Sequence, residues 1–331
     1  MAKSANQKLK LMYLMEILKE RTDEKHYLSM SEIIEALAAY GVSAERKSIY
    51  DDFETLRTYG FNVEGEKING KYGYHLLEHQ FELAELKLLV DAVLASRFVT
   101  AKQSRQLVDK LCAFTSKYEA KQLKRELFVT ERVKSVNESI FYNVDAIYEA
   151  INSDSKIDFK YYEWTTNKEL ELRQNGIKKG INPIALIWDD ENYYLVAYDG
   201  EAAKLKHYRV DKMRNIVVAE DTRDNKEAYE DIDMVTYAKK MFGMFSGAEM
   251  TVALECSNDM VGVIIDRFGT NLMIVPKADD KFSVHFTVQL SKQFLAWVFS
   301  LGDKVRIVSP AEAVEAMKDE ARRLMKQYDI E

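Results

Sequence analysis

The sequence predicts a multidomain protein of the α+β class. Its 331 residues are enough for two or three ordinary domains. Apolar residues recur at helical spacing in the first part of the chain, and short strand-like runs follow in the middle. The last part mixes strands with helices. We place the segment boundaries as follows: 1–77, 78–140, 141–222, 223–247 and 248–331.

The segment 42–60 carries the clearest functional pattern. Ser43 is a suitable N-cap, because its hydroxyl can accept a hydrogen bond from a free backbone N–H at a helix start. Gly60 supplies a helix stop. Apolar residues recur between them at helical spacing: Ile49, Phe53 and Leu56. A short helix that buries one side and leads with hydrogen-bond donors suits a DNA major groove. The predicted DNA contacts are Ser43, Arg46, Lys47, Ser48 and Tyr50.

Two amphipathic helices are predicted before this segment, over 7–21 and 31–40. Either Ser29 or Ser31 could cap the second. The turn at 40–42 is short enough for a helix-turn-helix.

A hairpin is predicted after the segment, with strands at 61–64 and 72–76. The Asn-Gly pair at 69–70 is a strong tight-turn signal, because both residues tolerate positive φ. Three helices and a hairpin are the order of a winged helix-turn-helix, and Lys67 and Lys71 would lie on its wing near DNA phosphates. The alternative is a small helical domain with a hairpin and no role in DNA binding.

The charge balance weakens the case for DNA binding. The formal net charge is −7, and residues 1–75 hold 11 Lys and Arg against 12 Asp and Glu. DNA-binding domains are usually basic, because phosphate neutralisation supplies much of their affinity. Binding would therefore depend on a few well-placed cations and on two copies acting together. We expect three later acids of the helix to point away from phosphate or to cap neighbouring groups: Asp51, Asp52 and Glu54.

The remaining composition predicts a cytoplasmic, non-catalytic protein without a metal or cofactor. No apolar run approaches the ~20 residues that span a bilayer, and the first residues carry no secretory pattern. Cys112 and Cys256 are isolated, which excludes a Cys-based zinc site. Gly-rich phosphate loops, His-Glu metal patterns and nucleophile elbows are missing from the sequence. The spacing of His75 and His79 is best explained by chance or solvent exposure.

Three helices are predicted next, over 81–98, 104–117 and 119–127, as a helical linker. This region is more basic than its neighbours. A solvated face is the favoured explanation of that charge.

The middle of the chain predicts a small β-barrel. A helix over 144–153 precedes several short runs with turns between them. The predicted strands are 156–162, 180–188, 192–198, 204–210 and 215–218.

The C-terminal part has the ferredoxin-like split βαβ order plus a terminal helix, after a helical segment that ends near Ser246. The predicted elements are 250–256, 259–268, 271–276, 282–289, 291–300, 305–308 and 311–328.

The block 181–213 resembles the WYL domain. The family is named for a Trp-Tyr-Leu triplet, and Tyr193-Tyr194-Leu195 stands in its place. Lys212 stands where the family often has Arg, so the planar bidentate fork is lost. The resemblance covers almost the whole chain and implies a winged helix, a helical linker, a WYL barrel with an Sm- or SH3-like fold, and a ferredoxin-like extension.

The resemblance also implies a bacterial transcription regulator, usually a homodimer, whose WYL region senses an effector. In such relatives the effector is often single-stranded DNA or a nucleotide. Tyrosines offer stacking faces here, and His, Arg and Lys offer donors or charge to phosphate. The candidate effector residues are Tyr161, Tyr193, Tyr194, His207, Arg209, Lys212 and Arg267. Alternatively, the tyrosines pack the barrel and Arg209 pairs with a carboxylate.

The leading hypothesis is therefore a regulator whose binding to a double-stranded DNA operator changes when a nucleic-acid or nucleotide effector binds. The alternative is a nucleic-acid or nucleotide-binding module that uses its winged helix mainly for protein contact. The acidic balance motivates that alternative.

Overall fold

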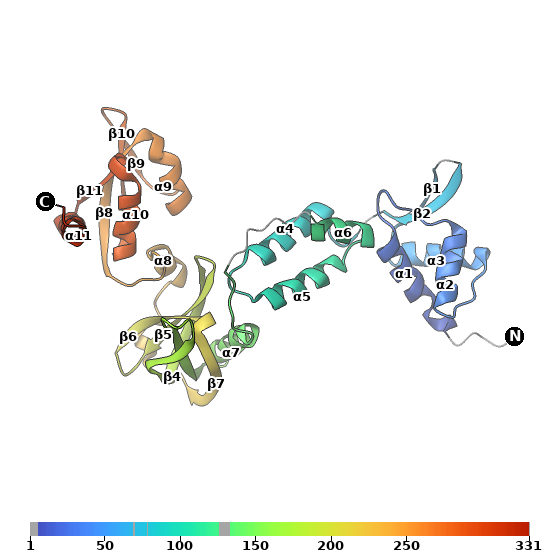
Figure 1. Ribbon diagram of the computed structural model, residues 1–331, viewed down its shortest axis with the longest axis horizontal. Helices are drawn as coiled ribbons and strands as arrows, with labels where there is room; N and C mark the ends of the chain where they lie inside the picture. The colour runs from blue at the N-terminus through green and yellow to red at the C-terminus, as the bar shows by residue number, and fades with distance from the viewer. Residues whose placement is uncertain (1–5, 69, 78, 126–132, 331) are drawn as a thin grey trace. The chain divides into compact units, whose positions relative to one another are not determined.

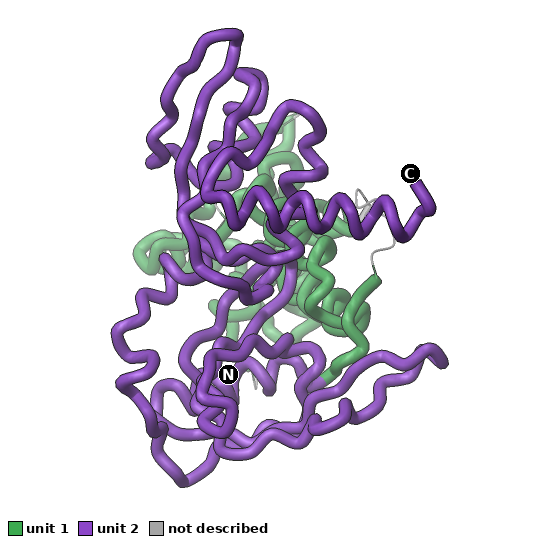
Figure 2. Tube along the Cα trace, turned by 90° about the vertical axis from the view of Figure 1, so that its left-hand side faces the viewer, with its two compact units in different colours: residues 1–138 green, residues 139–331 purple. Residues whose placement is uncertain are grey.

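The computed structural model describes residues 6–68, 70–77, 79–125 and 133–330. It divides into two compact units, unit 1 at 1–138 and unit 2 at 139–331 (Figure 2). Asn69 of the predicted turn and the predicted end of the third linker helix lie outside the described residues.

Unit 1 begins with three helices and a hairpin (Figure 1), the element order that the sequence predicts. Their bounds are α1 Lys10–Arg21, α2 Met30–Ala39, α3 Arg46–Thr58, β1 Val63–Ile68 and β2 Lys71–Leu76, with a short 3-10 helix at Gln7–Leu9. Ser29, not Ser31, caps α2: its hydroxyl accepts from the Glu32 N–H, and its own N–H donates to the Glu32 carboxylate.

The start of α3 differs from the prediction. Glu45 occupies the N-cap position and makes no side-chain capping bond, so Ser43 is not the N-cap. The reason is Val42, which is buried and whose N–H donates to the Leu37 carbonyl at 3.1 Å. That anchor keeps the next residues out of the helix until Arg46.

The apolar stripe of α3 forms part of one core, as predicted. Its members are buried with apolar residues of α1 and α2: Leu14, Ile17, Ile33, Leu37, Ile49, Phe53 and Leu56. Gly60 follows the helix with φ +98°, a conformation that favours glycine.

The hairpin pairs β1 with β2 from Val63↔Leu76 to Ile68↔Lys71. It is longer than predicted on its first strand, because pairing continues up to the turn. Leu28 adds an isolated bridge beside Tyr74, with backbone bonds of 2.9 and 2.8 Å.

The helical linker completes unit 1 with its own small core. Its helices are α4 Leu83–Ala95, α5 Ala101–Cys112 and α6 Lys117–Arg125. Lys134, one of the basic residues of this region, is partly buried. Its ammonium donates to the carbonyls of Leu94 at 2.9 Å and Ser96 at 2.8 Å and to the Ser104 hydroxyl at 2.9 Å. This lysine therefore fixes the end of α4 instead of presenting charge to a partner.

Unit 2 opens with a helix and a five-stranded antiparallel sheet of order β6-β5-β4-β3-β7. The bounds are α7 Ile140–Asn152, β3 Ser155–Trp164, β4 Leu170–Asp189, β5 Asn192–Asp199, β6 Lys204–Arg209 and β7 Met213–Thr222. All five predicted strands are present. β6 and β7 lie at the two edges of the sheet and do not pair with each other. β4 starts ten residues earlier than predicted. The pairing of β3 with β4 shifts register between Lys160 and Tyr162, which leaves residues 173–176 as a bulge in β4.

A short helix joins this sheet to the C-terminal part: α8 Met234–Lys239. The prediction of a helix that ends near Ser246 is wrong, because 242–245 forms a tight bridge between two phenylalanines.

The C-terminal part has a four-stranded sheet of order β11-β8-β10-β9, in which every pair is antiparallel. Its elements follow the predicted strand and helix order. Their bounds are β8 Ala248–Ser257, α9 Val261–Phe268, β9 Ile274–Lys277, β10 Lys281–Leu290, α10 Lys292–Ser300, β11 Val305–Ser309 and α11 Ala311–Gln327.

Short 3-10 helices occur at Val210–Lys212, Lys226–Ala228, Asn258–Met260 and Gly302–Lys304. Within the described parts of the chain, every helix is too short or too polar to cross a bilayer.

Candidate nucleic-acid interface and effector pocket

The first turn of α3 presents a cation and an aromatic ring to solvent. Arg46 Nε donates to the Tyr50 hydroxyl at 3.3 Å, and that hydroxyl lies 2.8 Å from the Tyr74 hydroxyl of β2. Burial, and then the bond to Tyr50, raises the pKa of Tyr74 to about 12. The bond to Tyr50 raises the pKa of Arg46, so this guanidinium stays charged. Lys47 is also exposed. Three of the predicted contacts, Arg46, Lys47 and Tyr50, are thus accessible.

Ser48 does not belong to this exposed face. Its hydroxyl contacts the ammonium of Lys10 on α1, which also forms an ion pair with Asp52. Ser48 and Asp52 are four residues apart, so both lie on the side of α3 that packs on α1. The prediction that Ser48 faces the groove is therefore wrong, because a buried lysine on another helix captures it. Ser43 is exposed, but it lies in the connection before the helix.

A hollow of about 350 Å³ lies between α3 and the hairpin. Tyr50, Tyr72 and Arg57 are among its lining residues. Arg57 was missed by the sequence reasoning: its Nη1 pairs with Glu54 at 2.6 Å and its Nε donates to the Val63 carbonyl at 2.8 Å. The Glu54–Arg57 spacing of three residues was the available signal. Gly65 also lines the hollow, and a Cβ at that position would lie 2.9 Å from the Tyr72 ring.

Lys67 and Lys71 are exposed near the tip of the hairpin. Strand alternation gives them different faces. Lys67 pairs in register with Tyr72 and shares the face of the hollow, whereas Lys71 belongs to the opposite face.

Unit 2 contains a larger pocket of about 880 Å³. The bulge of β4, strand β6 and the 243–246 segment line it. Among the described residues of the lining, one is acidic, Asp190, and six are cationic: Arg173, Lys178, Lys204, Lys206, Arg209 and Lys212. This charge imbalance favours an anionic occupant.

Five predicted effector residues line this pocket: Tyr161, Tyr194, His207, Arg209 and Lys212. Tyr193 and Arg267 do not. Alternation along β5 turns Tyr193 to the other face, where its ring meets Trp188 edge-to-face at 4.7 Å between centroids. Arg267 donates to the Met241 carbonyl at 3.1 Å and its guanidinium lies 4.2 Å from the centre of the Phe242 ring.

Arg209 is held by a carboxylate, the alternative that the sequence left open. Its Nε and Nη2 donate to Asp211 at 3.0 and 2.9 Å, and Nη2 also donates to the Asn192 side chain at 2.9 Å. The bond to Asp211 raises the pKa of Arg209. The Tyr161 hydroxyl accepts from the Arg209 N–H at 3.1 Å. Tyr161 is buried, so its main contact is this structural one.

His207 and Tyr208 give the pocket neutral polar groups. His207 Nε2 lies 3.0 Å from the Tyr237 hydroxyl, and burial lowers the pKa of His207. The Tyr208 hydroxyl is buried without a hydrogen-bond partner in the described parts of the chain, and burial raises its pKa. Sequence reasoning missed Tyr208 and four of the lining cations: Arg173, Lys178, Lys204 and Lys206. The run of lysines and arginine at 173–179 and 204–206 was a signal, but its position at the pocket depends on the bulge of β4.

The comparisons with known proteins match the two halves of unit 2. The model of the WYL domain matches residues 142–218, and that of the WCX domain matches 248–325. No curated protein sequence matches the chain. Among solved structures, the chain is similar to proteasome accessory factor B/C (PafBC) of Arthrobacter aurescens, with 16% identity and a TM-score of 0.27. That match covers 99% of this chain and 50% of the other, so the chain spans about half the length of PafBC. The chain therefore contains a WYL domain followed by a WCX domain.

Proposed function

We propose that this protein binds double-stranded operator DNA through unit 1 and an anionic, nucleic-acid-like or nucleotide effector through unit 2. Effector binding changes the affinity for the operator. The observation that carries the proposal is the pocket of unit 2, with six cationic side chains against one acid in its described lining.

The pocket suits phosphate and bases together. Phosphate oxygens would accept hydrogen bonds from lysine and arginine, which have no acceptor of their own. Lys178, Lys204 and Lys212 form no ion pair with an acid in the described parts of the chain, so they are ready for a ligand. Tyr194 supplies a half-buried ring at the same surface, on which a base can stack.

Unit 1 offers a small DNA-binding face. Arg46 and Lys47 stand at the exposed start of α3, where side chains of a recognition helix reach base edges. Two nearby acids are already engaged: Asp52 pairs with Lys10 and Glu54 with Arg57. These contacts agree with the expectation that acids of α3 engage neighbouring groups, and they reduce the repulsion of phosphate.

A gel-shift titration with the DNA upstream of the chain's own gene tests the DNA-binding part. The variant Arg46→Ala/Lys47→Ala should lose specific binding by at least ~25-fold, since each of the two lost base contacts contributes ~1–3 kcal/mol and about 1.4 kcal/mol corresponds to a factor of ten. The matched control is Arg105→Ala/Lys110→Ala, which removes two exposed charges of α5. It should bind the operator almost as tightly as the wild type does, because the loss of two distant charges changes only the net charge of the protein.

Two results would defeat the proposal. One is the absence of salt-sensitive duplex binding at any concentration of single-stranded DNA or nucleotide. The other is equal binding by the α3 variant and its control. That second result would favour the alternative function, in which the three helices and hairpin contact a protein.

We further propose that the protein acts as a homodimer in the cytoplasm of a bacterium and binds its ligands without chemical turnover. Helix-turn-helix operators are commonly read by two-fold symmetric dimers. Light scattering coupled to gel filtration would test this: a monomer at the concentrations that saturate the operator contradicts it.

A further inference from the structure

One face of the β1–β2 hairpin gathers two carboxylates and an imidazole. Glu64 and Glu66 are two residues apart on β1, so their side chains share a face. His75 of β2 lies directly opposite Glu64 in the register. One potential ligand atom from each of the three residues lies within 4.8 Å of the other two.

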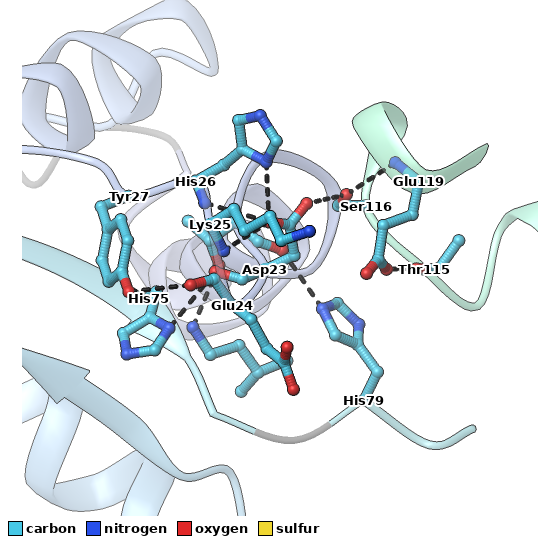
Figure 3. Close-up of polar contacts among 12 residues, drawn as sticks. Asp23, Glu24, Lys25, His26, Tyr27, His75, His79, Thr115, Ser116 and Glu119 are labelled. Atoms are coloured by element: carbon cyan, nitrogen blue, oxygen red, sulfur yellow. Dashed lines mark hydrogen bonds and ion pairs between the residues drawn. The ribbon is translucent and has the colours of Figure 1, made fainter. Parts of the chain in front are cut away.

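One ring nitrogen of His75 has no partner among the described residues. The side chain is 3% exposed, and Nε2 is buried without a hydrogen bond to any described group. Nδ1 lies 3.3 Å from the carbonyl oxygen of Asp23. A carbonyl can only accept, so this contact favours the neutral tautomer with the proton on Nδ1 and a lone pair on Nε2. Figure 3 shows the second ring nitrogen of His75 pointing away from the contact to Asp23. An unsatisfied buried acceptor destabilises the fold, and a bound cation would remove that cost.

The contact to Asp23 is also the arrangement that orients metal-binding histidines. Such residues usually donate their other ring N–H to a carbonyl or carboxylate. The Asp23 loop is itself fixed, because Asp23 Oδ1 accepts from the N–H groups of Lys25 at 2.9 Å and His26 at 3.0 Å (Figure 3). The Ser116 hydroxyl donates to Asp23 Oδ2. The carbonyl that orients the His75 ring is therefore held in place without a bound ion.

The Tyr27 ring packs against the His75 ring and restricts its position. The two ring centres are 4.4 Å apart, at a tilt of 49°. Tyr27 can approach because β2 has Gly73 there: a Cβ at that position would lie 2.8 Å from the Tyr27 Cβ. Gly73 is the register partner of Glu66, so the Glu66 side chain has no cross-strand side chain opposite it.

We propose that Glu64, Glu66 and His75 form a binding site for one divalent first-row transition-metal ion such as Zn²⁺. One imidazole nitrogen and two carboxylates suit such ions, whereas Mg²⁺ and Ca²⁺ prefer oxygen ligands alone. Lys71 lies on the same hairpin face as Glu64 and Glu66, but neither glutamate forms an ion pair with a described residue. The two carboxylates on one strand face repel each other, and a divalent cation bound between them would offset that repulsion by attracting both. This site departs from the sequence-based expectation of no metal.

Calorimetric titration of the full chain with Zn²⁺ tests the proposal. The wild type should bind one ion per chain with micromolar or tighter affinity. Glu64→Gln and Glu66→Gln should each weaken that binding at least ~10-fold, and the double variant should abolish it. Both side chains are exposed, so these changes preserve the fold. Glu35→Gln, which neutralises an exposed glutamate of α2, is the matched control and should bind as the wild type does.

Co²⁺ provides a second readout, because its visible absorption reports the ligand set. The spectrum should appear with wild type and with Glu35→Gln and be absent from the double variant, and millimolar Mg²⁺ should not displace the ion. The proposal is overturned if the wild type binds no Zn²⁺ at micromolar concentration, or if the double variant retains wild-type affinity. Because no DNA is present, the result is independent of the proposed regulatory function.

Discussion

The ion pair between Arg209 and Asp211 should limit how tightly unit 2 binds an anion. Asp211 holds the guanidinium through two bonds of 3.0 and 2.9 Å, at the edge of a pocket lined by cations. An effector phosphate must compete with this carboxylate. Asp211→Asn removes the competing charge but keeps one acceptor oxygen to orient Arg209. We therefore expect the variant to bind an anionic ligand more tightly than the wild type.

The exposure of the pair sets the size of the effect. The side chains of Arg209 and Asp211 are 36% and 17% exposed, so the pair is partly solvated. Solvated ion pairs contribute up to about 1 kcal/mol, and 1.4 kcal/mol corresponds to a factor of ten in affinity. Release of Arg209 should thus improve affinity about fivefold. Greater burial of the pair would make the gain larger.

Fluorescence anisotropy with a labelled 12-nucleotide oligothymidylate provides the assay. It is best done in the Arg46→Ala/Lys47→Ala background, so that α3 contributes no binding. Asp190→Asn is the control: it removes one charge from the same pocket without touching Arg209. Its effect should stay below twofold, because Asp190 is exposed and screened. If Asp211→Asn binds no better than Asp190→Asn, competition by Asp211 is not what limits the affinity.

Three more predictions concern the supports of the two units. Lys134→Met should destabilise unit 1 by about 3 kcal/mol, because several carbonyls near the end of α4 lose their donor; Lys102→Met, which disrupts only an exposed 3.6 Å pair, should cost under about 0.5 kcal/mol in the same urea titration. Lys226, then Arg223, hold the pKa of Asp154 below its ordinary value, so the stabilisation is present above pH ~4 and lost as the pH falls through the folded-state pKa. Asp154→Asn should flatten the fall in melting temperature below pH 4, since Asn tolerates the φ of +56° at this position; an unchanged acid limb would contradict the assignment. Gly176→Ala should lower both stability and oligothymidylate affinity, because its Cβ would lie 2.5 Å from the Tyr161 carbonyl oxygen; normal binding by a stable variant would show that the bulge is not needed.

Most secondary-structure elements were predictable because their signals are local. The stripe Ile49, Phe53 and Leu56 reports one helix face directly, and all three residues are buried. The alternation of β5 likewise separated Tyr193 from Tyr194. The prediction erred by assigning both rings to one site, although adjacent strand residues point to opposite faces.

Several functional side chains were beyond sequence reasoning because their partners are distant in the chain. Ser48 has the residue type of a DNA contact, yet Lys10, 38 residues earlier, captures its hydroxyl. The bulge that brings Arg173 to the pocket arises from a register shift between β3 and β4. Neither event leaves a periodic pattern in the sequence.

The sequence by itself determined the order of helices and strands, the WYL resemblance and the cationic start of α3, because spacing between near neighbours encodes which face is apolar. The tertiary structure decided which charges remain available. It paired Arg209 with Asp211 and Lys206 with Asp199, and left Lys178, Lys204 and Lys212 of the pocket without an ion pair to a described acid. It also brought Glu64 opposite His75 through the hairpin register and buried His75, so solvent exposure does not explain that histidine. The physical reason is that charge pairing and metal geometry depend on distances across strands, which residue spacing does not specify.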